Sequence, residues 1–207
     1  MEWGLAVFTG VYVAYKSGAR LRPSVTIGLF TAQEPFFSAT GPGWLVTATI
    51  EPTVGNMFLY FGAQMIGAFV GAVLAFLAYK KHFDADAPGA TKLAVFSTGP
   101  EIRSYAWNFV TEVIATFVLV FFVVASGKTP SGLGPLAVAL IVVGIGASLG
   151  GPTGYAINPA RDLGPRIAHA VLPIRGKGSS DWAYAWVPVA GPLVGGVLAG
   201  LLGAAWV

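Results

Sequence analysis

The short segment Asn158-Pro159-Ala160-Arg161 carries side chains that could do chemistry inside an apolar environment. A helix can begin at Pro159, because the N–H that proline lacks would be unpaired at that position. The Asn158 oxygen can cap this helix while its amide N–H groups point into a cavity as donors. Arg161 adds five donors and a fixed positive charge, which favours a neutral polar solute over a metal ion. Taken alone, an Arg in an apolar region more commonly extends to the lipid headgroups, but the adjacent Asn-Pro-Ala favours a water-filled cavity.

Few other residues could support catalysis or metal binding. The chain has two His and no Cys, and its apolar stretches contain no paired carboxylates. A hydrolase or a metal site therefore has few residues to use, and we expect neither enzymatic activity nor a metal or other cofactor. Glu112 lies inside an apolar stretch, where an unpaired carboxylate would be costly, so we expect it to accept hydrogen bonds.

Composition places most of the chain in a lipid bilayer. Hydrophobic residues make up 55% of the 207 residues and charged residues only 10%, against about 25% charged residues in ordinary soluble domains. The net charge is +3, but the Lys and Arg residues lie mostly in short connections and form no basic stripe with interleaved aromatics. We therefore expect no nucleic-acid partner.

Five stretches are apolar enough to be membrane spans. A span needs about 20 residues to cross the hydrocarbon, and the first stretch is shorter than that. The five stretches are Trp3–Tyr15, Gly55–Tyr79, Tyr105–Ala125, Gly134–Gly150 and Trp182–Val207. Two further pieces, 17–30 and 151–170, contain turn residues, then a Pro and a short apolar stretch, and each predicts a loop followed by a half-helix.

The two halves of the chain resemble each other. Pro23 aligns with Pro159, and the spans that follow share the small-residue faces Gly67-x-x-x-Gly71 and Gly191-x-x-x-Gly195. Paired copies with broken helices are typical of transport folds built from inverted repeats. We expect a first repeat over 1–80 with two spans, a connecting loop over 81–104, and a second repeat over 105–207 with three. The first copy would lack a span before Met1, and its extra length after the half-helix includes Glu34-Pro35 and Gly41-Pro42-Gly43.

The segment 154–166, Gly-Tyr-Ala-Ile-Asn-Pro-Ala-Arg-Asp-Leu-Gly-Pro-Arg, resembles the second pore loop of the aquaporin, or major intrinsic protein, family, in its glycerol-conducting branch. Ser17-Gly-Ala-Arg-Leu-Arg-Pro-Ser-Val-Thr26 resembles the first pore loop. The resemblance covers almost the whole chain. It implies an all-α membrane protein with an inverted repeat, five of the family's six spans and two re-entrant half-helices. It also implies a passive channel for glycerol, other small neutral solutes and water, a multi-pass plasma-membrane location and a homotetramer.

The resemblance also implies roles for individual residues. The selectivity filter would comprise Trp3, Gly146, Tyr155 and Arg161, with an aromatic corner for the alkyl backbone and Arg161 for the hydroxyls. Asn158, Pro159 and Ala160 would form one pore-centre motif, and Arg22, Pro23 and Ser24 the other. Glu112 would brace a pore loop, and Asp162 would hold the loop beside Arg161. Outside this register, Trp3 and Tyr155 would be interfacial aromatics and Gly146 a helix-packing residue.

The first motif departs from the family pattern. Arg22 stands where the family has Asn, Ser24 where it has Ala, and Arg20 where it has His. Arg22 could occupy the pore, tighten cation exclusion or turn away toward the vestibule, so a non-conducting structural homologue remains the alternative function. The family topology would place four Lys and Arg inside and six outside, once Arg161 and Arg166 are left out, which opposes the positive-inside tendency.

Overall fold

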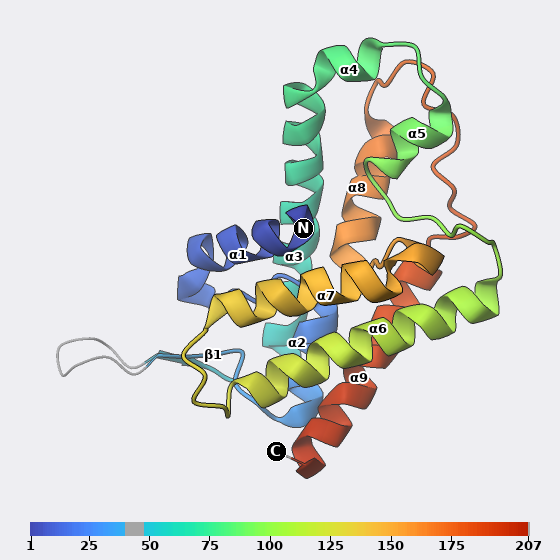
Figure 1. Ribbon diagram of the computed structural model, residues 1–207. Coiled ribbons are helices and arrows are strands. Elements are labelled where there is room, and N and C mark those ends of the chain that lie inside the picture. Colours follow the sequence, from blue (N-terminus) through green and yellow to red (C-terminus); the bar gives the residue numbers. More distant parts are fainter. Residues whose placement is uncertain (40–47, 207) are drawn as a thin grey trace.

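The computed structural model describes residues 1–39 and 48–206 and shows a bundle of helices with one small hairpin (Figure 1). The helices are α1 (Glu2–Val13), α2 (Pro23–Ala32), α3 (Val54–Ala78), α4 (Lys80–Asp84), α5 (Gly89–Ala94), α6 (Tyr105–Ser126), α7 (Pro135–Thr153), α8 (Pro159–Val171) and α9 (Val187–Trp206). A 3₁₀ turn, η1 (Tyr15–Ser17), follows α1, and the strands are β1 (Phe37–Ala39) and β2 (Ala48–Ile50).

Four helices in the described part of the chain are long and apolar enough to cross a membrane: α3, α6, α7 and α9. The first predicted span corresponds to α1, which has 12 residues and is shorter than the roughly 20 that a full span needs. It ends at Val13 because the chain turns through η1 into the first pore loop. The fifth span begins at Val187 rather than Trp182, since residues 182–186 form turns, and Val207 lies outside the described residues.

The two half-helices begin at the predicted prolines, Pro23 of α2 and Pro159 of α8. In each case the preceding residue has an extended backbone, so the chain enters the helix abruptly at its first proline. The loops before them also share a left-handed bend, at Gly18 with φ 71° and at Gly154 with φ 73°. The sequence similarity between the two segments therefore extends to their backbone conformation.

The half-helices pack against spans of the opposite half of the chain. Half-helix α2 lies against α9, and α8 lies against α3 (Figure 1). Glycines permit the first of these contacts, because a Cβ at Gly200 would lie only 2.3 Å from the Gly28 carbonyl oxygen. The two halves are thus interlocked around the point where the half-helices begin.

The two predicted small-residue faces have different surroundings. A Cβ at Gly191 would lie 2.7 Å from Glu112 Cβ, and one at Gly195 would lie 2.5 Å from the Val113 carbonyl oxygen, because α6 packs tightly on α9. At Gly67 and Gly71 of α3 a Cβ would meet no described atom within 4 Å. The face on α9 is a helix contact, and the face on α3 is open.

A two-stranded antiparallel hairpin follows α2 and was not predicted from the sequence. It pairs Phe37 with Ile50 and Ser38 with Thr49. Fully buried Phe36 anchors the hairpin, since its ring packs edge-on against Tyr60 and its N–H donates to the Ile50 carbonyl at 2.8 Å. Gly41-Pro42-Gly43 lies outside the described residues.

We predict that Gly195→Ala destabilises the chain by about 1–3 kcal/mol, the usual cost of overpacking, because its Cβ would overlap the α6 backbone. Gly144→Ala is the matched control, since Gly144 is exposed on α7 and meets nothing within 4 Å. Thermal unfolding in detergent would measure both. Equal stability of the two variants would contradict the close α6–α9 packing.

Candidate functional site

The two pore loops meet where the half-helices begin, and side chains from each loop bind the backbone of the other. Ser24 Oγ donates to the Ile157 carbonyl at 2.9 Å, a buried contact. In the reverse direction, Asn158 Nδ2 donates to the Leu21 carbonyl at 3.3 Å. Ser24, one of the departures from the family pattern, thus gives the chain a link that an Ala could not provide.

Asn158 is the N-cap of α8. Its Oδ1 accepts a hydrogen bond from the Ala160 N–H at 3.1 Å, which fixes the orientation of the side-chain amide. One amide hydrogen is directed to Leu21, and Asn158 also lines the cavities described below. Asn158 therefore both caps α8 and presents a donor at the meeting point of the loops.

Glu112 of α6 holds the second pore loop. Its fully buried carboxylate accepts from Thr153 Oγ1 at 2.6 Å, from the Ala156 N–H at 2.9 Å and from the Ile157 N–H at 2.8 Å. Two residues of this loop, Tyr155 and Ile157, have positive φ angles of 38° and 41°. A positive φ is unfavourable for residues other than Gly, and the hydrogen bonds to Glu112 help to hold the loop in this conformation.

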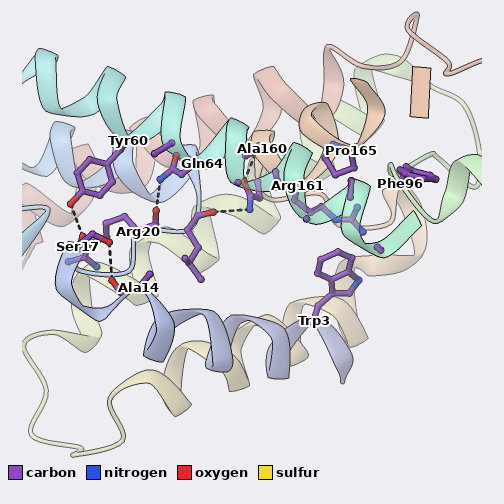
Figure 2. Close-up of a pocket in the computed structure, with 18 of the residues that line it drawn as sticks. Trp3, Ala14, Ser17, Arg20, Tyr60, Gln64, Phe96, Ala160, Arg161 and Pro165 are labelled. Atoms are coloured by element: carbon purple, nitrogen blue, oxygen red, sulfur yellow. Dashed lines mark hydrogen bonds between the residues drawn. The ribbon is translucent and has the colours of Figure 1, made fainter. Parts of the chain in front are cut away.

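The first pore loop is held from α3 instead. Tyr60 Oη donates to the Ser17 carbonyl at 2.6 Å, and Gln64 Nε2 donates to the Arg20 carbonyl (Figure 2). Gln64 Nε2 also donates to Thr26 Oγ1 at 2.9 Å. In the alignment of the two repeats, Arg20 and Leu21 correspond to Ala156 and Ile157, whose N–H groups bind Glu112. Within residues 1–39 and 48–206 neither first-loop N–H donates a hydrogen bond, so the counterpart of the Glu112 contact is missing there.

Three of the four predicted filter residues line one cavity of about 170 Å³, which we call the filter hollow. Arg161 stacks on Trp3 with its guanidinium carbon 4.1 Å from the ring centroid, a cation–π contact, and the two side chains face each other in Figure 2. Tyr155 lies in the same hollow. The lining residues are Trp3, Ala6, Val7, Leu21, Arg22, Val142, Tyr155, Ala156, Ile157, Asn158 and Arg161.

The fourth predicted filter residue, Gly146, acts on the hollow through Tyr155. A Cβ at Gly146 would lie 2.9 Å from Tyr155 Cζ, and one at Gly150 would lie 2.9 Å from Tyr155 Cδ1. The ring of Tyr155 therefore occupies the space that side chains at these two positions would fill. Gly146 thus makes room for the aromatic ring of Tyr155.

Arg22 lies between the filter hollow and a second hollow of about 160 Å³ that Gly18, Ala19, Val123 and Gly134 also line. It is 7% exposed and is the N-cap of α2 without any side-chain capping bond. Arg22 is thus buried at a position that lines both hollows.

A third cavity, about 740 Å³, runs along α3 and opens one side of the site (Figure 2). The small residues Gly67, Gly71 and Ala75 line its α3 wall, and Asn158 and Arg161 reach it from the pore loop. The open glycine face of α3 is therefore continuous with the polar site.

Asp162 joins the start of α8 to the loop that precedes α6. Its carboxylate accepts from the Thr98 N–H and Thr98 Oγ1, both at 2.7 Å. Fully buried Arg166 donates to Asp162 at 2.8 Å and to the carbonyls of Thr98 and Ser180. The sequence analysis missed this role of Arg166, although its four-residue spacing from Asp162 on a helix could have indicated the ion pair.

Three further Lys and Arg residues outside the long apolar helices also bind backbone carbonyls or a carboxylate. Lys177 Nζ donates to the carbonyls at the end of α8, those of His169, Ala170 and Leu172, and Lys92 Nζ donates to those of Phe83 and Arg175. Arg103 binds both carboxylate oxygens of Asp181 and so lowers the pKa of that carboxyl. Among the residues described, no group of three His, Cys, Asp or Glu is placed to hold a metal ion.

We predict that Glu112→Ala destabilises the chain more than Glu112→Gln does. The Ala variant leaves the Ala156 and Ile157 N–H groups unpaired at about 1–3 kcal/mol each, whereas Gln retains one acceptor oxygen. Thermal unfolding in detergent and protease resistance of the 151–158 loop would measure the difference. Two variants of wild-type stability would show that the second loop does not depend on Glu112.

Comparison with known proteins identifies the family. The family model "Major intrinsic protein" matches residues 1–202. The chain is 49% identical to glycerol uptake facilitator protein 3 of Lactiplantibacillus plantarum, over 98% of this chain and 78% of that protein. It is 50% identical to the probable glycerol uptake facilitator protein of Thermotoga maritima, over 95% and 78%. The structure of the aquaglyceroporin from Plasmodium falciparum superimposes with a TM-score of 0.75 at 29% identity, over 98% of this chain and 78% of that one. This chain is thus a multi-pass membrane protein with the aquaporin-like fold, and it belongs to the major intrinsic protein family.

Proposed function

We propose that the chain is a passive channel for glycerol and other small neutral polar solutes, with water passing as well. The observation that carries this proposal is the meeting of two half-helix N-termini at Asn158, beside the filter hollow of Trp3, Tyr155 and Arg161. Relatives about half identical to the chain are named glycerol uptake facilitators, which supports a transport protein rather than an enzyme.

The hollow suits a molecule with an apolar backbone and several hydroxyls. The rings of Trp3 and Tyr155 provide surfaces for C–H groups, while Arg161 and Asn158 provide donors for hydroxyl oxygens. The N-termini of α2 and α8 carry partial positive charge, and together with Arg161 they disfavour cations.

We further propose that the channel works as a homotetramer in plasma-membrane lipid. Large apolar side chains of α3, among them Phe58, Leu59, Ile66 and Leu74, are exposed in the single chain. A surface of this kind requires lipid or another subunit as its neighbour. Cross-linking in native membranes would measure the number of subunits.

The alternative, a non-conducting homologue, has one observation in its favour. Arg22 lies between the two hollows of the lumen, where it could obstruct passage. If it does, Arg22→Asn would conduct glycerol and the natural chain would not.

We predict that vesicles containing the purified chain take up glycerol faster than empty vesicles and show no added ion conductance. Light scattering after a glycerol gradient measures the first property, and the current across a planar bilayer measures the second. Uptake equal to that of empty vesicles, from protein shown to be folded, would contradict a conducting channel.

We predict that Gly146→Ala lowers glycerol uptake severalfold, because the new methyl group would push the Tyr155 ring toward the filter hollow. Gly144→Ala, two residues earlier on the same helix, is the matched control and should leave uptake unchanged. An unchanged rate in Gly146→Ala would show that the position of Tyr155 does not limit passage.

A further inference from the structure

Arg22 is a buried cation for which the described part of the chain provides no partner. Its side chain donates no hydrogen bond within residues 1–39 and 48–206, although the residue is only 7% exposed. Two buried carboxylates of the second half are engaged elsewhere, Glu112 with the second pore loop and Asp162 with Thr98 and Arg166. A guanidinium in such a place requires water or an anion against its N–H groups.

Arg161 adds a second charge to the same hollow. Its guanidinium stacks on Trp3 and makes no hydrogen bond to a described residue, so its donors are also free to bind a ligand. The N-termini of α2 and α8 converge here as well, and partial positive charge at a helix start favours an anion. Arg22, Arg161 and the N-cap residue of α8, Asn158, therefore line one cavity of about 170 Å³, and Arg22 is itself the N-cap of α2.

We propose that the filter hollow binds a small monocarboxylate anion between Arg22 and Arg161. The planar guanidinium fork matches the two oxygens of a carboxylate, and two such groups can bind it from both sides. The remaining lining is largely apolar, with Trp3, Val7 and Val142, and so provides contacts for a short alkyl chain. A larger anion with oxygens on every side, such as phosphate, would place polar atoms against this apolar wall.

This site extends beyond a path for neutral solutes. Because Arg22 replaces a neutral Asn of the family pattern, it introduces charge recognition that the pattern itself does not contain. The bound carboxylate would share the hollow with glycerol and compete with it. Binding can be measured without any flux, so the anion site and the glycerol channel can fail independently of each other.

The test is isothermal titration calorimetry, which measures the binding of acetate and of acetamide to the purified, detergent-solubilised chain. Acetamide has the shape of acetate without its charge. We expect saturable acetate binding and acetamide binding weaker by at least about tenfold, the effect of roughly one charged hydrogen bond. Acetate binding that does not saturate, or equal affinity for the two probes, would overturn the proposal.

Substitutions at Arg22 test whether the bound acetate contacts this residue. Arg22→Asn should weaken acetate binding by about tenfold or more, and Arg22→Lys should weaken it less, because Lys keeps the charge and loses the fork. Arg175→Asn is the matched control, since Arg175 is exposed in the loop after α8, away from the hollow, and its loss should leave acetate binding unchanged. Equal loss in the Arg22 and Arg175 variants would show non-specific attraction and overturn the proposal. If Arg22→Asn does not fold, the Lys variant and the comparison of the two probes still decide the outcome.

A second measurement separates this inference from the proposed channel. Acetate at equal concentration on both sides should slow glycerol uptake by the natural chain and leave Arg22→Asn unaffected. Glycerol uptake that acetate does not slow, in a chain that takes up glycerol, would contradict a shared hollow. Saturable acetate binding by a chain without glycerol uptake would contradict the channel and leave the anion site intact.

Discussion

The backbone N–H groups exposed by two helices that begin in the middle of a membrane impose the central constraint on this fold. Lipid offers these groups no acceptor, so the protein must supply one or line the place with water. In the second pore loop Glu112 supplies it, accepting from two consecutive N–H groups and from Thr153. Ser24 and Asn158 then join the two loops, so the position of each half-helix depends on the other.

The two halves of the chain satisfy this constraint to different extents. On α9, Gly191 and Gly195 admit α6 closely enough for Glu112 to reach its loop. On α3, Gly67 and Gly71 form an equally small face, but the large cavity lies over it. The Arg20 and Leu21 N–H groups, whose counterparts bind Glu112, find no acceptor among the described residues. The first pore loop therefore lacks, among the described residues, the acceptor that Glu112 provides for the second loop.

Local sequence signals predicted the parts of the structure that depend on neighbouring residues. Pro23 and Pro159 determine where the half-helices begin, and long apolar stretches predicted α3, α6, α7 and α9. The hairpin and the Arg166 contacts were not predicted, because they depend on residues distant in sequence, such as Phe36 with Tyr60 and Arg166 with Ser180. Some of the Lys residues in the charge count bind backbone carbonyls, which a count of charges in the sequence does not reveal; Lys92 and Lys177 are examples.

Arg22 affects charged and neutral solutes to different extents. The filter hollow is lined by Trp3, Tyr155 and Val142 as well as by Arg22 itself. A neutral solute is affected by the electrostatic potential only through its dipoles, whereas the energy of an ion changes in proportion to its charge. A second unpaired guanidinium beside Arg161 therefore repels cations more strongly and attracts anions, with a far smaller effect on a polyol. The residue that departs most from the family pattern thus changes which charges the lumen accepts.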